Sequence, residues 1–280
     1  MKRNYDPVGM PNLLNSKYMT FTKPAFFCLL LLAATPVPAA PGAVSEFEQV
    51  VADRLAERRV PGQMIWLQAE GRQFLGLYLP PPPGVPKQAV ILLHGLGGHP
   101  DWPDVIQPLR TQLPALGWGT LSIQLPRLSL QASHADEMEL PRRVWPRIQA
   151  AAAWLVAQGA ARVVLAGYGF GAALGARYAG VFGKDLSGFV AISLQTPEYL
   201  AERIAFPESL EAVRVPVLDV YAAADAAIVL QQVPERELWG RKNKERAFDH
   251  LVIAGAGADY RGREAELARK VADWLNANAK

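Results

Sequence analysis

Side chains that could do acid–base or nucleophilic chemistry are few in this sequence, which has four histidines and one cysteine. His94 follows an apolar run and is interpreted as structural, its ring N–H holding the loop that follows. His99 lies in a glycine-rich loop and His250 at the start of an expected strand, so neither is favoured for chemistry. His134 is the exception, because its polar segment is expected above the carboxyl edge of a sheet, where ligands bind in such folds.

Ser193 is expected at that same edge, at the end of another strand. A site built from Ser193, His134 and Asp225 is conceivable, but the spacing of the three residues matches no known signature. A role for Ser193 as a turn or helix cap is the simpler interpretation.

Cofactor and metal signatures are missing from the sequence. Gly95, Gly97 and Gly98 are not followed by Lys-Ser/Thr and do not form Gly-x-Gly-x-x-Gly at the start of a helix, so no nucleotide site is expected. His and carboxylate clusters with metal-ligand spacing are absent. Neither a metal nor any other cofactor is expected.

Strands and helices alternate along the chain. Strands are expected at residues 63–68, 73–79, 89–93, 119–124, 162–166, 188–192, 215–221 and 247–254, and helices at 45–58, 108–116, 141–158, 170–182 and 263–276. Continuous apolar runs such as 89–93 are typical of buried parallel strands. The order predicts an α/β fold with a mostly parallel, twisted sheet flanked by helices.

The connections refine this prediction. A tight turn is expected at Glu70-Gly71, and the polar segment 125–140 is expected to be irregular. The short connection between the strands at 188–192 and 215–221 leaves room for a lid but not for a large cap domain.

Three segments resemble the α/β-hydrolase superfamily. Leu93-His94-Gly95 ends an apolar strand, Gly167-Tyr168-Gly169-Phe170-Gly171 joins a strand to a helix, and 215–225 and 252–260 precede the last helix. More narrowly, the chain resembles a proteobacterial family of exported α/β-hydrolase-like proteins of unknown function. This resemblance rests on Pro216-Val217-Leu218-Asp219-Val220-Tyr221 and on a secretory signal in residues 1–39 without a cap domain.

This resemblance implies a degenerate catalytic triad. In the superfamily, a Gly-x-Ser-x-Gly turn lifts the nucleophile out of the sheet, but Gly169 stands at that position here. Asp225 matches the acid. The histidine falls on Ala258, or on Asp259 if the alignment shifts by one, and neither can act as an imidazole base. No catalytic residue is expected.

The resemblance also implies an oxyanion hole made of backbone N–H groups, which do not depend on side-chain identity. Its donors are expected near Leu96 and at Phe170, with His94, Gly95 and Tyr168 as further oxyanion or pocket residues. The N-terminus of the helix at 170–182 adds a field that favours an anion.

These observations predict a non-catalytic pseudo-hydrolase that binds a small amphiphile or a protein partner in the cell envelope. The alternative is a serine esterase or amidase with a non-standard site, in which Ser193 is the first candidate for the nucleophile.

The N-terminal segment has the features of a secretory signal. Lys17 and Lys23 precede an apolar run at 25–34, and Val37 and Ala39 fit a cleavage site. Residues 1–39 are therefore expected to be a leader, with Met19 as a possible true start, and 40–280 a single α/β-hydrolase-like domain in the periplasm or secreted. A retained N-terminal anchor is the alternative. The apolar run is too short to span a bilayer, and the mature chain has no expected transmembrane segment.

Charge excludes one class of partner. The formal net charge is +3, and the leader alone carries it, so the rest is close to neutral and no nucleic-acid partner is expected. A basic stretch from Arg236 to Arg246, which includes Trp239, is interpreted as a solvated surface.

Overall fold

The computed structural model describes residues 46–85, 87–126, 134–196 and 207–280, all within one compact unit, Ala40–Lys280. Its elements, in chain order, are α1 (Glu46–Glu57), β1 (Gln63–Ala69), β2 (Arg72–Leu79), β3 (Gln88–Leu93), α2 (Ile106–Gln112), the 3-10 turn η1 (Pro114–Leu116), β4 (Gly119–Ile123), α3 (His134–Ala157), β5 (Arg162–Tyr168), α4 (Phe170–Phe182), η2 (Gly183–Asp185), β6 (Gly188–Ile192), α6 (Pro207–Ala212), β7 (Val217–Ala224), α7 (Ala227–Gln231), α8 (Val233–Lys242), β8 (Phe248–Gly257) and α9 (Glu264–Asn278).

The strands form an eight-stranded sheet in the order β1-β2-β4-β3-β5-β6-β7-β8. From β4 to β8 every neighbouring pair is parallel, whereas β1–β2 and β2–β4 are antiparallel. The expected turn is confirmed: Ala69 pairs with Arg72, and Glu70 and Gly71 both have positive φ, which is the geometry of a two-residue type I′ hairpin.

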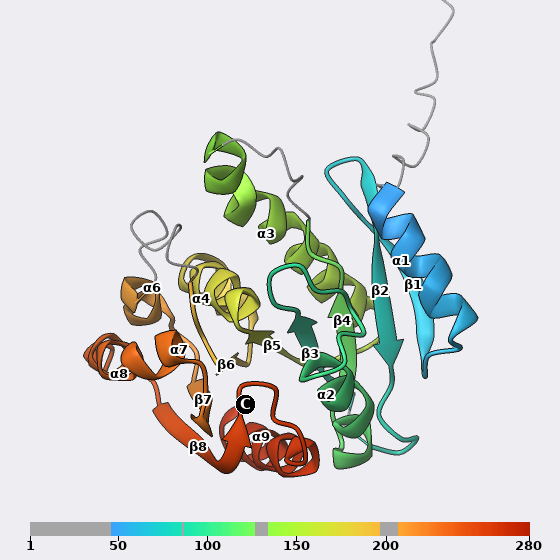
Figure 1. Ribbon diagram of the computed structural model, residues 1–280. Helices are drawn as coiled ribbons and strands as arrows, with labels where there is room; N and C mark the ends of the chain where they lie inside the picture. The colour runs from blue at the N-terminus through green and yellow to red at the C-terminus, as the bar shows by residue number, and fades with distance from the viewer. Residues whose placement is uncertain (1–45, 86, 127–133, 197–206) are drawn as a thin grey trace, which may run out of the picture. The chain divides into compact units, whose positions relative to one another are not determined.

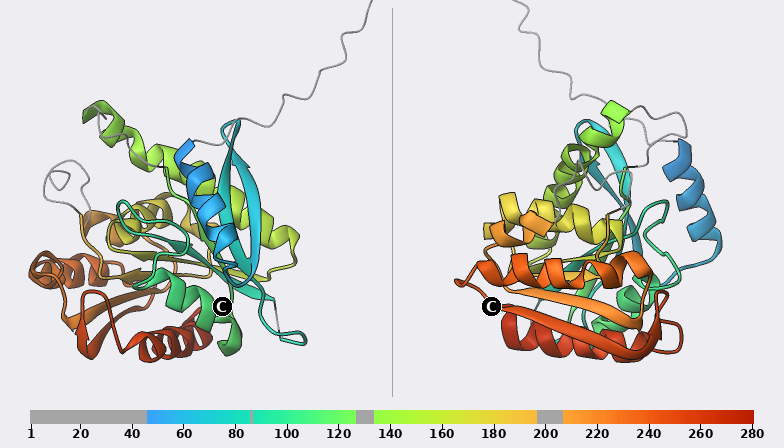
Figure 2. Two further views of the ribbon diagram at one scale, coloured as in Figure 1. Left: turned by 45° about the vertical axis from the view of Figure 1, so that its right-hand side comes forward. Right: turned by 60° about the vertical axis from the view of Figure 1, so that its left-hand side comes forward.

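Helices cover both faces of the sheet (Figure 1). Alternate residues of each parallel strand point to opposite faces, so the sheet divides the core in two. Ile91, Leu165 and Phe189 pack with α3 and α4, whereas Val90, Val164 and Val190 pack with α2 and α9. The views in Figure 2 show α1 lying alongside the β1–β2 hairpin, where it forms a smaller third core.

The sequence predicts that the segment 125–140 is irregular, but the structure shows that its last part is helical. The helix α3 begins at His134, not at residue 141, so that Pro141 and Pro146 both lie inside it. Proline favours the first turn of a helix, which made 141 the expected start. A proline inside a helix sacrifices one backbone hydrogen bond, but Leu140, Val144 and Ile148 are buried in the core and hold the helix in place.

The interpretation of Arg236 as a solvated residue is wrong. Arg236 lies on α8, one of three helices that the sequence pattern did not predict, together with α6 and α7. Its side chain is fully buried and pairs with Asp219 of β7, with 3.0 Å between Nε and Oδ2. A ten-residue helix with few apolar residues gave no stripe from which to predict its buried side.

None of the described helices has both the length and the hydropathy that a bilayer-spanning helix requires.

Candidate functional site

The turn between β5 and α4 contains three glycines, Gly167, Gly169 and Gly171. Gly169 adopts φ 57° and ψ −121°, a left-handed φ that favours glycine. Its N–H donates to the Ile192 carbonyl of β6 at 2.9 Å. At Gly167 an added Cβ would lie 2.6 Å from the backbone nitrogen of Ala172, and at Gly171 it would overlap the carbonyl oxygens of Leu93 and His94. The turn therefore packs directly on the end of β3.

The central position of this turn is different, because it has room. A Cβ at Gly169 would meet only the Gln195 side-chain amide, at 3.7 Å. The two outer glycines are required by close backbone contacts, while the middle one leaves space unfilled. A side chain at 169 would project into that space.

A cavity of about 480 Å³ opens over this turn. The residues around it come from the loop after β3, from the β5–α4 turn, from the segment after β6 and from α7. They are Gly95, Leu96, Gly98, Trp102, Asp104, Tyr168, Gly169, Phe170, Gln195 and Ile228. Its volume lies within the range of small-molecule sites, which are about 300–1,000 Å³ and mostly apolar.

Four of the five expected oxyanion and pocket residues lie on this wall: Gly95, Leu96, Tyr168 and Phe170. Phe170 is the first residue of α4, and no side chain caps that end of the helix, so its N–H has no intrahelical partner. The Leu96 N–H makes no backbone hydrogen bond within the described residues. Both N–H groups remain available to a ligand.

His94, the fifth, lies behind the loop instead of on the cavity wall. Its Nε2 accepts a hydrogen bond from the Leu125 N–H at 3.0 Å, which leaves the proton on Nδ1, 2.8 Å from the Gly95 carbonyl. Burial lowers the pKa of His94 to about 4, because an imidazolium ion would lose its hydration there. His94 is thus a neutral residue that ties together the loops after β3 and β4.

Ala258 lies in the loop between β8 and α9 and does not line the cavity. Its carbonyl accepts a hydrogen bond from the Tyr168 hydroxyl at 3.1 Å. Burial raises the pKa of Tyr168 to about 12, and the nearby Asp104 carboxylate adds to the effect. The protonated phenol therefore links this loop to the elbow turn.

Asp225 and Ser193 do lie together, as one of the sequence hypotheses requires. The Ser193 hydroxyl donates to Asp225 Oδ2 at 2.6 Å. Their third partner, however, is the Tyr260 hydroxyl, 2.9 Å from Ser193 Oγ. Backbone N–H groups of Ala222 and Ala226 also donate to the Asp225 carboxylate, at 3.0 and 2.8 Å.

This Ser193–Asp225–Tyr260 cluster is buried and does not line the cavity. Burial raises the pKa of Tyr260, so its hydroxyl stays protonated. Ser193 and Tyr260 both have positive φ, of 45° and 55°, which non-glycine residues rarely adopt. His134 begins α3, but its side chain lies outside the described ones.

Sequence reasoning did not place several of the cavity residues. Trp102 lines the wall, and its Nε1–H donates to Asp104 Oδ2 at 3.0 Å. Gln195 and Ile228 carried no signal, because each reaches the cavity through a turn or short helix whose direction only the fold sets. Tyr260 was visible in the expected histidine loop, but nothing in the spacing paired it with Ser193.

Among the residues that the structure describes, no group of three or more His, Cys, Asp or Glu side chains is placed to hold a metal ion.

Comparison with known proteins gives one family and one fold. A family model described as "Protein of unknown function (DUF3530)" matches residues 22–141 and 129–277. No curated protein sequence matches the chain.

Similar solved structures are esterases and related hydrolases. Est1E from Butyrivibrio proteoclasticus is 14% identical, with a TM-score of 0.60, over 76% of this chain and 98% of that one. The dienelactone hydrolase from Anabaena variabilis ATCC 29413 is 17% identical, with a TM-score of 0.61, over 78% and 98%. The Pyrococcus furiosus esterase Pf2001 is 15% identical, with a TM-score of 0.62, over 81% and 96%. At these identities the likeness shows the fold alone: the protein has the α/β-hydrolase fold.

Proposed function

The chain belongs to the family described as "Protein of unknown function (DUF3530)", and from the geometry of its site we propose that it is a non-catalytic α/β-hydrolase-fold protein that binds a small amphiphile in the cavity over Gly169. The observation that carries this proposal is the Gly169 turn itself. It has the backbone geometry of a nucleophile elbow and an open space above it, but no side chain to attack a substrate.

The other two triad positions support the same proposal. Ala258 has no imidazole to accept a proton, and the Asp225 carboxylate is already bonded to Ser193 and to two backbone N–H groups. None of these three hydrogen bonds comes from a base that the carboxylate could orient. Asp225 acts instead as the acceptor that closes the turn after β7.

The chemistry of the cavity wall favours a small amphiphile as the ligand. Leu96, Trp102, Phe170 and Ile228 supply an apolar surface, while Gln195, Asp104 and the Tyr168 hydroxyl supply polar groups. Leu96 is 54% exposed, so binding would remove its apolar surface from water.

The alternative, an esterase or amidase that uses Ser193, is less well supported. Ser193 is only 2% exposed, its hydroxyl donates to Asp225, and its other neighbour is a phenol and not a base. A substrate in the cavity over Gly169 would not reach this hydroxyl without rearrangement of the cluster.

The test is to restore the two missing side chains. We would compare residues 40–280 of the natural protein with the double variant Gly169→Ser/Ala258→His, using p-nitrophenyl acetate and butyrate. Because Gly169 has room for a Cβ, the serine should fit, and the free N–H groups of Leu96 and Phe170 can stabilise an oxyanion. We expect background hydrolysis by the natural protein and ester hydrolysis above background by the double variant.

The two single variants are the controls, and each should stay near background because a serine without its base gains little. Hydrolysis by the natural protein that disappears in Ser193→Ala would overturn the proposal in favour of the alternative.

Export belongs to the proposal as well. We expect cleavage near Ala39 and a mature chain that is periplasmic or secreted. This expectation depends on residues 1–39, which lie outside the described residues. N-terminal sequencing of the protein from cell fractions tests it, and an intact leader in the membrane fraction would favour the retained anchor.

A further inference from the structure

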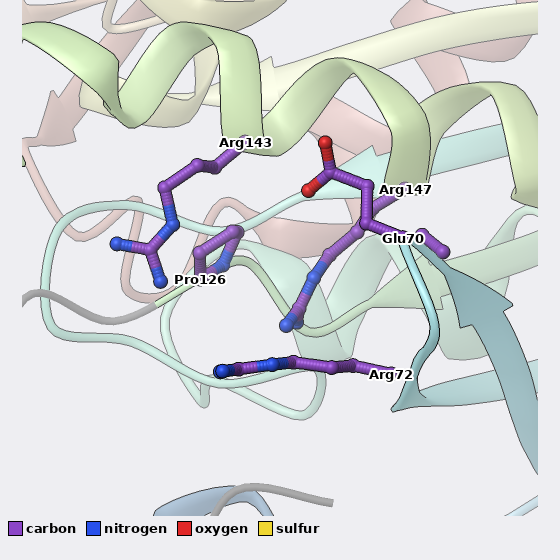
Figure 3. A pocket seen from close by; sticks show the side chains of 6 residues that line it. Glu70, Arg72, Pro126, Arg143 and Arg147 are labelled. Atoms are coloured by element: carbon purple, nitrogen blue, oxygen red, sulfur yellow. The ribbon is translucent and has the colours of Figure 1, made fainter. Parts of the chain in front are cut away.

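A second pocket lies between the β1–β2 hairpin and α3 (Figure 3). Ala69, Glu70, Arg72, Pro126, Arg143 and Arg147 line it, and its volume is about 310 Å³. We call it the arginine pocket. It shares no lining residue with the cavity over Gly169.

Three guanidinium groups face this pocket. Arg143 and Arg147 are four residues apart on α3, which places them on the same side of the helix. Arg72 begins β2 and approaches from the opposite wall. Figure 3 shows the three guanidinium ends turned toward the same space, and in this view the Glu70 carboxylate lies between the Arg143 and Arg147 side chains, near α3.

Arg147 is held in place by the protein. Its Nη1 donates to the Gln124 carbonyl at 2.8 Å, its Nη2 pairs with Glu48 at 2.8 Å, and its guanidinium lies over the Phe74 ring at 4.9 Å. A fixed cation therefore forms the floor of the pocket.

Arg72 and Arg143 have no such partner. Arg72 is exposed and Arg143 half-buried, and neither forms an ion pair with a described residue. The neighbouring Arg142, by contrast, pairs with Glu139 outside the pocket. Within the described part of the chain, two of the guanidinium groups that face the pocket thus have no ion-pair partner, and Glu70 is the one acidic residue of the lining.

The three cations also disfavour one another. The pKa of Arg147 is lowered mainly by burial, which the Glu48 carboxylate opposes, and the charges of Arg143 and Arg72 lower it further. Like charges on neighbouring helix positions cost stability. A bound anion would relieve this repulsion.

We propose that the arginine pocket binds a small molecule that carries a phosphate monoester. Arginine forms paired N–H···O bonds to phosphate oxygens, and guanidinium groups on two opposite walls suit a tetrahedral anion better than a flat carboxylate. A phosphate monoester carries a charge of about −1.5 to −2 at neutral pH, which two unpaired guanidinium groups match. The volume leaves room for an organic group beside the phosphate.

The test uses glycerol 3-phosphate and the purified full-length chain, by isothermal titration calorimetry at constant ionic strength set with sodium chloride. We expect saturable binding, weakened about tenfold by Arg143→Gln and by Arg72→Gln, as the loss of one charge-assisted contact predicts. Arg142→Gln is the matched control, because it removes the same charge one residue away, and binding should change less than about twofold.

A second measurement separates this site from a general surface effect. Without phosphate, Arg143→Gln should raise the Tm relative to Arg142→Gln, because it relieves repulsion within the pocket. Absence of saturable binding, or equal weakening in Arg142→Gln and Arg143→Gln, would overturn the proposal.

Two sources could supply this group: a free phosphate ester or a phospholipid headgroup. Sedimentation with phosphatidic acid vesicles, beside phosphatidylcholine vesicles, distinguishes them. Vesicle binding that Arg143→Gln weakens points to the lipid, and binding of glycerol 3-phosphate alone points to the free ester.

Discussion

At the residue scale, the three glycines of the turn at 167–171 have different roles: two are required by steric contacts, and the third occupies the position of a nucleophile. Gly167 and Gly171 are required because the chain passes within contact distance of Ala172 and of the end of β3. Gly169 is not crowded, and only its φ of 57° favours glycine. The architecture of the turn can therefore persist without a nucleophile.

Alanine substitutions should reveal this difference. Gly169→Ala should lower the free energy of unfolding by about 1–3 kcal/mol, the cost of a strained backbone position. Gly171→Ala should cost more, because its Cβ would overlap the carbonyl oxygens of Leu93 and His94, which lie at the end of the central strand β3 and cannot move freely. Urea denaturation checks the order, and equal losses would contradict it.

At the element scale, one buried ion pair joins α8 to the sheet. Arg236 of α8 bonds Asp219 of β7 through Nε and reaches the Val229 carbonyl of α7 at 2.8 Å. His250 of β8 lies 3.1 Å from the same carboxylate. The pair thus joins α7 and α8, two helices that the sequence pattern did not predict, to β7 of the sheet.

Asp219→Ala should therefore be costly. It would leave the Arg236 charge buried without its partner, and such a loss lowers the free energy of unfolding by about 3–5 kcal/mol. Arg241→Ala on the same helix breaks only the exposed pair with Glu237 and should cost less than about 1 kcal/mol. If both variants lose the same stability, the pair does not hold α8.

At the scale of the whole molecule, stability should depend on pH through His94. Burial lowers the pKa of His94 to about 4 in the folded protein, whereas an exposed histidine has a pKa of about 6.5. As the pH falls below about 6.5, His94 becomes protonated in the unfolded state but stays neutral in the folded state, so the free energy of unfolding decreases. The loss approaches about 3 kcal/mol near the folded pKa.

His94→Asn should flatten this dependence. The asparagine amide does not titrate and can still donate to the Gly95 carbonyl. We expect its Tm to fall less than that of the natural protein between pH 7 and pH 5, as measured by circular dichroism. His99→Asn is the control, because His99 is less buried than His94 and burial lowers its pKa by a smaller amount. An unchanged slope in His94→Asn would exclude His94 as the cause.

By itself, the sequence determined the class of fold and most of the strands, because continuous apolar runs such as 89–93 have few stable places other than the middle of a parallel sheet. It also determined that position 169 has no nucleophile, since that depends only on residue type. Periodicity failed at α3, where two prolines lie inside a helix held by its core contacts, and at α8, where the buried residues are an arginine and a glycine.

Tertiary structure alone decided which distant side chains meet. Ser193 and Tyr260 are 67 residues apart in the chain yet share a hydrogen bond, and Arg72 faces Arg143 across a pocket between a hairpin and a helix. Local pattern sets which face a residue occupies, but a contact between elements depends on the order of the strands and the path of each loop. Those are properties of the packed chain as a whole.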